Sequence, residues 1–287
     1  MKKLSLVLAT YNEEKNIAAC LESAKDLADE MIVVDGSSTD KTVEIARSHG
    51  AKVIVTDNPP IFHINKQKAL DAARNEWVLQ LDADERVSER LAKEIEKVIS
   101  LSDIELETYQ ESLPNKDLFL RHQHLLEKRD GKIGTSKGPY NAFFIPRLNF
   151  FLGRYLRYGG VYPDGVIRLV RRGKAKFPCR DVHEQIEVEG RVGWLARDLI
   201  HMADPTFRRY RQRNSRYTDL MARQYREEHL KKNFINTMKY MLLYPIGWFG
   251  LTYIRHKGFL DSWQGLAFSA YSSLRFPISY VKYLRGN

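Results

Sequence analysis

Hydrophobic and polar positions in the N-terminal third of the chain alternate between two patterns. Continuous apolar runs are typical of strands covered on both faces, whereas apolar residues at every third or fourth position are typical of helices. The predicted strands are residues 4–10, 31–34, 53–55 and 77–81, and the predicted helices are residues 17–24, 40–49 and 65–73. Strands that alternate with helices indicate a mostly parallel sheet, flanked by helices and connected by right-handed crossovers.

The pattern becomes less regular after the fourth predicted strand. Ser88 is expected to cap a helix that reaches about residue 98. Residues 102–138 are highly charged and end in three glycines, so we expect a helical insertion followed by a loop. Two further strands, with an aromatic and basic loop between them at residues 149–157, are predicted at residues 140–145 and 166–170.

A basic helix is predicted from residue 207 to residue 230, and the tail beyond it mixes apolar, aromatic and basic residues. We therefore predict two parts, an α/β domain over residues 1–204 and a helical region over residues 205–287. Residues 205–287 hold 15 Lys and Arg against 4 Asp and Glu, whereas residues 1–204 hold 31 against 32. The whole positive excess of the chain thus belongs to the helical region.

Polar residues follow three of the predicted strands at the points where they end. Tyr11 and Glu13 follow the first strand, Asp35 ends the second, and Asp82 and Asp84 follow the fourth. The carboxyl ends of parallel strands meet at one edge of a sheet, where ligands bind in open α/β folds. These side chains are therefore predicted to share one crevice.

The triplet Asp82-Ala83-Asp84 places two carboxylates where a buried strand gives way to a loop. Oxygen ligands of this kind suit Mg²⁺ or Mn²⁺, which bind one or two carboxylates together with the phosphates of a substrate. The alternative is a pair of solvated loop carboxylates. The small residues after Asp35 would let a planar ring or a phosphate approach the backbone. The alternative there is an ordinary turn in which Asp40 caps the next helix.

The two cysteines, Cys20 and Cys179, lie far apart in the sequence and have no metal-ligand spacing, which fits a reducing cytoplasm. The apolar run after Met1 is short and is followed at once by charged residues, so we read it as a strand and not as a signal peptide. The longest apolar stretch, residues 240–254, is shorter than the roughly 20 residues that span a bilayer. The basic aromatic tail instead suits an amphipathic segment in an anionic membrane interface, or a packed helical subdomain.

The sequence resembles glycosyltransferase family 2, the inverting transferases with the GT-A fold. Three motifs carry the resemblance, in the order and spacing of the family: residues 9–16, 34–42 and 79–85. Residues 149–154, 160–164, 167–172 and 182–184 further resemble the bacterial branch that adds glucose to the lipopolysaccharide inner core. Residues 102–138 depart from that branch, and Lys68 stands where it more often has Arg.

The resemblance implies roles for individual residues. Tyr11, Glu13 and Asp35 would hold the nucleobase and ribose, and Lys68 would contact the donor. Asp82 would lie near the ribose and diphosphate, while Asp84 would bind Mn²⁺ or Mg²⁺. The full set of expected nucleotide-sugar contacts is Thr10, Tyr11, Glu13, Asp35, Ser37, Lys68, Asp82, Ala83 and Arg168, the last being suited to phosphates by its guanidinium.

The family uses a carboxylate to deprotonate the acceptor hydroxyl, which must lie within hydrogen-bond reach of that base. Glu184 is the first candidate and Asp181 the second, and His183 would orient Glu184 or touch the diphosphate. The alternative is an acidic turn before a strand at residues 185–188. His201 is a further candidate for metal or phosphate contact, the alternative being a structural histidine. The metal candidates are thus Asp84, Asp82 and His201.

The expected activity is transfer of a sugar, such as glucose, from a UDP-sugar to a saccharide or lipid-linked acceptor such as lipopolysaccharide core. The protein would act in the cytoplasm, bound peripherally to the inner face of the membrane through residues 205–287. No nucleic-acid partner is expected. Two alternatives stay open: nucleotidyl transfer to a sugar phosphate, and a non-catalytic protein that binds membranes or nucleic acid.

Overall fold

The computed structural model describes residues 4–180 and 185–286, which fold as two compact units. The first unit reaches residue 147 and resumes over residues 163–201. The second unit combines residues 148–162 with the chain from residue 202 onward. The predicted division into residues 1–204 and 205–287 stays a prediction about domains, and the structure adds residues 148–162 to the second unit.

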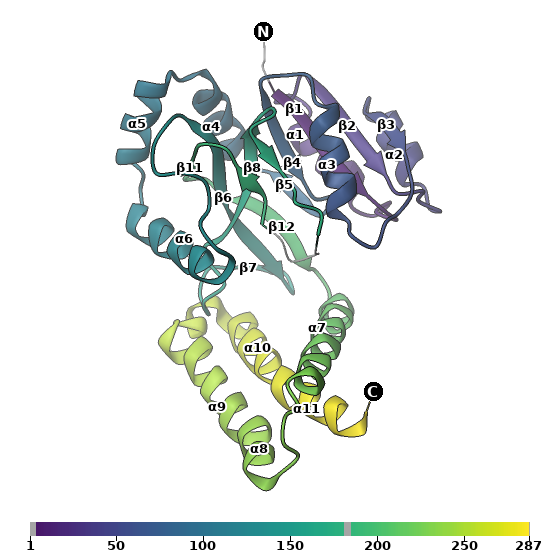
Figure 1. Ribbon diagram of the computed structural model, residues 1–287, viewed down its shortest axis with the longest axis vertical. Helices are drawn as coiled ribbons and strands as arrows, with labels where there is room; N and C mark the ends of the chain where they lie inside the picture. Colours follow the sequence, from purple (N-terminus) through teal and green to yellow (C-terminus); the bar gives the residue numbers. More distant parts are fainter. Residues whose placement is uncertain (1–3, 181–184, 287) are drawn as a thin grey trace. The chain divides into compact units, whose positions relative to one another are not determined.

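Four parallel strands form one half of the main sheet, in the order β3-β2-β1-β4. The intervening helices are α1, α2 and α3 (Figure 1). The strands are β1 (Leu4–Thr10), β2 (Glu30–Asp35), β3 (Lys52–Val55) and β4 (Trp77–Leu81), and the helices are α1 (Ile17–Ala24), α2 (Thr42–Ser48) and α3 (His63–Ala72). This arrangement confirms the predicted α/β fold class.

The other half of the sheet is mixed in direction. β8 (Asp164–Arg171) runs antiparallel to β4, and β6 (Tyr140–Phe151) runs antiparallel to β8. β12 (Leu199–Asp204) follows in the order and pairs with the short β5 (Glu85–Val87). The remaining strands are β7 (Arg154–Leu156) and β11 (Arg191–Trp194), which pair with β6, and the separate pair β9 (Ala175–Lys176) and β10 (Glu187–Val188).

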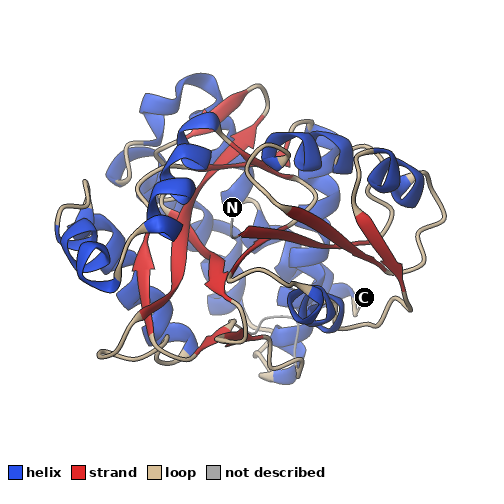
Figure 2. Cartoon of the chain, turned by 90° about the horizontal axis from the view of Figure 1, so that it is seen from above, coloured by secondary structure: helices blue, strands red, loops and turns tan. Residues whose placement is uncertain are grey.

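Both faces of the sheet are covered by helices (Figure 2). Alternate residues of β1 point to opposite faces, so Leu6 and Val7 enter different hydrophobic clusters. The Leu6 cluster includes residues of α1, α4 (Glu89–Ser100) and α5 (Asp103–Glu111), and the Val7 cluster includes residues of α3 and α6 (Lys116–Asp130). This double burial explains the continuous apolar runs in the sequence.

Local signals in the sequence agree with the structure in part. Ser88 caps α4 by accepting a hydrogen bond from the Leu91 N–H at 3.2 Å. Asp40 precedes the cap position of α2, which is Lys41, although its carboxylate accepts a hydrogen bond from the Thr42 N–H at 3.0 Å. The expectation that Asp40 is the N-cap was therefore wrong by one residue.

The segment at residues 102–138 is helical as predicted, and the segment at residues 149–157 contains more regular structure than the sequence suggested. Residues 102–138 contain two helices, α5 and α6, of which α5 begins with a capping box formed by Ser102 and Glu105. The aromatic segment at residues 149–157, predicted as a loop, is the end of β6 joined to β7 as a hairpin. Adjacent aromatics at Phe150 and Phe151, followed by Gly153, gave no period-two pattern in the sequence.

The second unit is helical apart from the β7 hairpin and the end of β12. Its helices are α7 (Phe207–Glu227), α8 (Phe234–Met238), η1 (Lys239–Leu243), α9 (Tyr244–Phe249), η2 (Gly250–Arg255), η3 (Gly258–Asp261), α10 (Ser262–Ser273) and α11 (Arg275–Arg285). α7 packs on α11 through Ala222, Tyr225, Tyr280 and Tyr283. None of the described helices has the length and apolar character needed to cross a bilayer.

Asp261 anchors the β7 hairpin to the helices of the second unit. Its side chain is buried and accepts hydrogen bonds from the backbone N–H groups of Arg157 and Tyr158, at 3.1 Å and 2.8 Å from Oδ2. The Arg154 Nε lies 4.0 Å from Oδ1. A carboxylate can accept both backbone bonds at once, so this one residue fixes the end of the hairpin.

We expect Asp261→Ala to lower the free energy of unfolding by about 1–3 kcal/mol, because two backbone N–H groups lose their buried, charged acceptor. Urea denaturation would measure this loss. Asp219→Ala is the matched control, since the Asp219 carboxylate is exposed and pairs with Lys282 at 2.6 Å. An exposed pair contributes less than about 1 kcal/mol. Equal losses in the two variants would contradict the anchoring role of Asp261.

Candidate active site

A cavity of about 330 Å³ opens at the carboxyl ends of β1 and β4. Its walls come from the end of β1, the segment leading into α3, the turn after β4 and one residue of β12. The residues that line it are Ala9, Thr10, Tyr11, Glu13, Asn58, Phe62, Asn65, Lys66, Asp82, Ala83, Asp84 and His201. The crevice predicted from the strand ends is therefore present, and it has donors, acceptors and an aromatic ring on its walls.

Asp82 is held between two cations. Its Oδ1 lies 2.6 Å from the Lys66 Nζ, and its Oδ2 accepts a hydrogen bond from Arg168. Burial alone raises the pKa of Asp82, but attraction to Arg168 and Lys66 outweighs burial and holds the pKa well below its ordinary value. The stabilisation from Asp82 is therefore complete above its unfolded-state pKa of about 4 and is lost as the pH falls through the lower folded-state pKa.

Arg168 joins the carboxylates that follow β4 to the neighbouring strand β8. Its Nη2 lies 2.8 Å from Oε1 of Glu85, which is fully buried, and its Nη1 donates to Gln80 at 2.6 Å. Burial alone lowers the pKa of Arg168, but Asp82 and Glu85 together raise it above its ordinary value. The guanidinium thus stays charged and fixes the orientation of both carboxylates.

Asp84 and His201 face each other across the cavity wall, with the His201 Nε2 3.6 Å from the Asp84 Oδ2. Strand pairing explains this approach, because β5 and β12 run antiparallel and place His201 opposite Glu85. The Asp82 carbonyl accepts a hydrogen bond from the Glu85 N–H at 2.9 Å, which closes a tight turn around Asp84. Carboxylate oxygens suit both Mn²⁺ and Mg²⁺, whereas an imidazole nitrogen is a ligand of transition-metal ions, so the pair favours Mn²⁺ over Mg²⁺.

The pair fits a metal that also takes ligands from a substrate. Among the described residues, no group of three or more His, Cys, Asp or Glu side chains is arranged to hold a metal ion. Mg²⁺ commonly binds one or two protein ligands together with substrate phosphates and water. The side chains of Asp84 and His201 are 19% and 14% exposed, so both reach the solvent-accessible cavity.

Lys66 and Asn65 add polar groups that the sequence analysis missed. Lys66 is buried on the inner face of α3, where burial lowers the pKa of its ammonium group and Asp82 opposes that effect. Asn65 donates to the Asp57 carbonyl at 2.9 Å, whereas its buried Oδ1 has no hydrogen-bond partner among the described residues. A ligand N–H or O–H in the cavity would satisfy that oxygen.

Four predicted donor contacts are absent from the cavity lining: Asp35, Ser37, Lys68 and Arg168. Asp35 is buried and accepts hydrogen bonds from the Thr10 hydroxyl at 2.8 Å and from the N–H and hydroxyl of Ser38 at 2.7 Å each. Ser37 and Lys68 are exposed and donate to the carbonyl and hydroxyl of Thr56, at 2.9 Å and 2.7 Å. Asp35 and Arg168 therefore hold lining residues in place, whereas the roles of Ser37 and Lys68 stay predictions.

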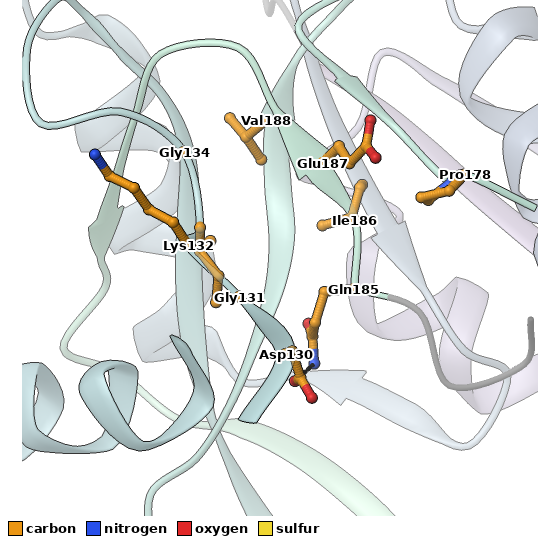
Figure 3. Close-up of a pocket in the computed structure, with 10 residues that line it drawn as sticks. Asp130, Gly131, Lys132, Gly134, Pro178, Gln185, Ile186, Glu187 and Val188 are labelled. Atoms are coloured by element: carbon orange, nitrogen blue, oxygen red, sulfur yellow. Dashed lines mark hydrogen bonds between the residues drawn. The ribbon is translucent and has the colours of Figure 1, made fainter. Parts of the chain in front are cut away.

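The predicted catalytic residues Asp181, His183 and Glu184 lie outside the described residues. A second cavity of about 600 Å³ is lined by residues on both sides of them in the sequence, Pro178 and residues 185–188, together with residues 130–134 (Figure 3). Gln185 donates a hydrogen bond to Asp130 at 3.1 Å and ties these two segments together.

A helical phase argument could have identified Lys66. Lys66 shares the inner face of α3 with Ala69 and Leu70, three and four residues later. Lys68 points elsewhere and is exposed. Asn58 and Phe62 lie in an irregular segment without periodicity, so no sequence pattern could place them at the cavity.

The sequence profile of glycosyl transferase family 2 matches residues 5–173, which include β1, β4 and the turn after β4. The chain belongs to glycosyl transferase family 2. The matched residues hold every cavity-lining residue except His201. Arg168 and Lys66, which hold Asp82, also lie within the matched part.

Similar proteins include an uncharacterized glycosyltransferase of Rickettsia typhi, 45% identical over 101 residues, which are 35% of this chain and 34% of that protein. The chain thus spans about a third of the length of this relative. The lipopolysaccharide core biosynthesis glycosyltransferase LpsC of Rhizobium meliloti is 25% identical over 280 residues, 93% of this chain and 88% of LpsC.

A solved structure of glucosyl-3-phosphoglycerate synthase from Mycobacterium tuberculosis, in complex with Mn²⁺, UDP and glucosyl-3-phosphoglycerate, is 29% identical. That likeness covers 29% of this chain and 34% of the synthase chain, with a TM-score of 0.27.

We expect Arg168→Met to lower the free energy of unfolding by about 3–5 kcal/mol, because Glu85 and Asp82 lose their shared buried cation. Arg171→Met is the matched control on the same strand, since Arg171 reaches solvent and its Nη2 lies 3.4 Å from the exposed Asp103. The control should lose less than about 1 kcal/mol. Urea denaturation of both variants would measure the difference, and similar losses would refute the role given to Arg168.

Proposed function

We propose that this protein is an inverting, metal-dependent glycosyltransferase that takes a sugar, such as glucose, from a UDP-sugar. The observation that carries the proposal is the convergence of Asp82, Asp84 and His201 on one cavity at the carboxyl ends of parallel strands. This is the place where α/β folds bind nucleotides. Membership of glycosyl transferase family 2 supports the same activity.

Asp84 and His201 are the residues that would hold Mn²⁺ or Mg²⁺. The two oxygens of Asp82 already face Lys66 and Arg168, so its carboxylate is better suited to orient the donor ribose and diphosphate than to bind the metal first. The bound metal would supply positive charge that stabilises the departing diphosphate. Lys66 adds a further positive charge on the same wall of the cavity.

The remaining cavity groups suit the nucleoside. Tyr11 is 46% exposed and offers its ring to a planar base at the end of β1. Glu13 accepts a hydrogen bond from Asn16 at 2.7 Å and is held at the start of α1. The unsatisfied Asn65 Oδ1 provides an acceptor for a base N–H or a ribose hydroxyl. Asp35 holds Thr10 in place and thereby supports this wall.

The acceptor is proposed to be a saccharide or lipid-linked saccharide such as lipopolysaccharide core, at the cytoplasmic face of the membrane. The similarity to LpsC over 93% of the chain supports this class of acceptor. Glu184 is the proposed base that removes the proton from the acceptor hydroxyl, with Asp181 as the second candidate and His183 as the residue that orients it.

Asp84→Ala should weaken Mn²⁺-dependent UDP binding by about tenfold or more, because the variant loses a charged metal ligand. Isothermal titration calorimetry with UDP, in Mn²⁺ and in EDTA, would measure it. Asp26→Ala, which removes an exposed carboxylate between α1 and β2, should bind UDP as the wild type does. UDP affinity that is the same in EDTA and in Mn²⁺ would rule out the metal assignment.

Glu184→Gln should keep UDP binding within about twofold and lower the rate of transfer by about a hundredfold or more, because the amide cannot accept the proton. Donor binding is measured by calorimetry, and transfer by release of UDP in the presence of acceptor. Asp181→Asn is compared in the same assays. Unchanged transfer in Glu184→Gln, with loss in Asp181→Asn, would move the base to Asp181.

A further inference from the structure

The helix α10 buries small polar residues and exposes two large apolar ones. Its buried residues are Gln264, Gly265, Ser269, Ser272 and Ser273. Phe268 and Tyr271 pack against an inner hydrophobic cluster, whereas Trp263 is 59% exposed and Leu266 is 45% exposed. A surface helix normally buries its large apolar side chains. Trp263 and Leu266 therefore form an apolar edge of α10 that the unit itself leaves uncovered.

The preceding helical segment is also apolar without being buried. Along α8, η1 and α9, none of the described residues is buried. Ile235, Leu243 and Ile246 are 63%, 59% and 67% exposed. A contiguous exposed apolar surface of this kind marks an interaction site. We call the exposed apolar side chains of residues 234–266 the apolar surface.

Small residues allow the two helical arms of this hairpin, α9 and α10, to pack close together. α9 and α10 lie side by side (Figure 1), and the turn between them brings Gly258 against Gly265. A Cβ added at Gly265 would lie 1.9 Å from the Gly258 carbonyl oxygen, so only glycine fits there. Packing through Gly and Ser, with large apolar residues outside, is typical of helices that associate in lipid.

The charges around the apolar surface have one sign. Residues 230–287 contain eight Lys and Arg against a single acidic residue, Asp261. Asp261 is buried and occupied by the β7 hairpin. Lys231, Lys239 and Lys257 are exposed along the hairpin. An apolar face bordered by exposed lysines complements an anionic lipid surface, which attracts juxtamembrane cations.

We propose that the apolar surface of the α8–α10 hairpin docks in the interfacial layer of an anionic bilayer, with Trp263, Leu243 and Ile246 at acyl-chain depth. Lys231 and Lys239 bind the lipid phosphates, the long stem of Lys239 reaching past its apolar neighbours. This docking is independent of the chemistry at Asp82 and Asp84, because no residue of the hairpin lines that cavity.

The aromatic residues of the tail, which the sequence pattern did not distinguish, divide into exposed and packed ones in the structure. Trp263 and Phe259 are exposed and belong to the apolar surface. Trp248 donates to the Ser272 hydroxyl at 3.1 Å, and Tyr271 packs its ring 4.7 Å from that of Phe207. Trp248 and Tyr271 therefore stabilise the helical unit, and only the first pair contacts lipid.

The test is flotation of the full chain with vesicles of equimolar phosphatidylcholine and phosphatidylglycerol. We expect the wild type to bind, and Leu243→Ser/Ile246→Ser to bind about tenfold or more weakly because apolar burial is lost. Lys231→Gln/Lys239→Gln should bind these vesicles about thirtyfold more weakly and lose its preference over pure phosphatidylcholine. Brominated lipid should quench the fluorescence of Trp263.

Ile104→Ser/Leu125→Ser is the matched control, since these side chains of the first unit are 81% and 60% exposed. The control should bind vesicles as the wild type does, and all variants should keep the wild-type affinity for UDP. Wild-type protein that does not float with anionic vesicles would overturn the proposal. A wild-type dimer that Leu243→Ser/Ile246→Ser converts to a monomer, without vesicle binding, would assign the surface to a second copy instead.

Discussion

Arg168 holds the acidic turn after β4 in place, and the geometry of the cavity depends on that contact. Arg168 lies on the neighbouring strand β8, and its guanidinium donates hydrogen bonds to Glu85, Asp82 and Gln80. Two carboxylates buried next to each other repel unless a cation lies between them. Arg168 and Lys66 neutralise Asp82 and Glu85, so the turn between these two residues is stable with Asp84 directed toward His201.

Because of this contact, Asp82 and Asp84 have different surroundings. The cations around Asp82 neutralise it and fix its direction, whereas Asp84 faces His201 across the cavity wall. A carboxylate already bound on both oxygens is a poor first ligand for a divalent cation but a good orienting group for a ribose. The different surroundings of the two carboxylates are the reason that we propose different roles for them, metal binding for Asp84 and donor orientation for Asp82.

Much of this was readable from the sequence, because the buried strands had continuous apolar runs and polar residues at their ends. Tyr11, Glu13, Asp82 and Asp84 were predicted in that way, and they share one cavity with His201, which was a separate candidate for metal or phosphate contact. Contacts between distant segments could not be predicted from the sequence. The position of Arg168, for example, depends on the pairing of β8 with β4, which no local pattern indicates. Lys68 came from the family resemblance and its donor contact stays a prediction, whereas Lys66 is found only from the inner face of α3.

The hairpin in the second unit shows a different limit of sequence reading. Its composition predicted both a packed core and a lipid-facing surface, and the choice between them differs from residue to residue. Sequence periodicity identifies an apolar stripe on a helix but does not show whether protein or another medium covers it. Ser269 and Ser272 are buried while Trp263 is exposed, which shows which side of α10 faces the other helices. This depends on how the helices pack, which the sequence pattern does not give.

Metal-dependent use of a nucleotide sugar is tested by release of nucleoside diphosphate from a panel of nucleotide sugars, measured with Mn²⁺ in the absence of acceptor. We expect slow hydrolysis of a UDP-sugar by the wild type that falls to background in Asp84→Ala and in EDTA. Hydrolysis that persists unchanged in Asp84→Ala, or that no nucleotide sugar supports above background, would contradict this expectation.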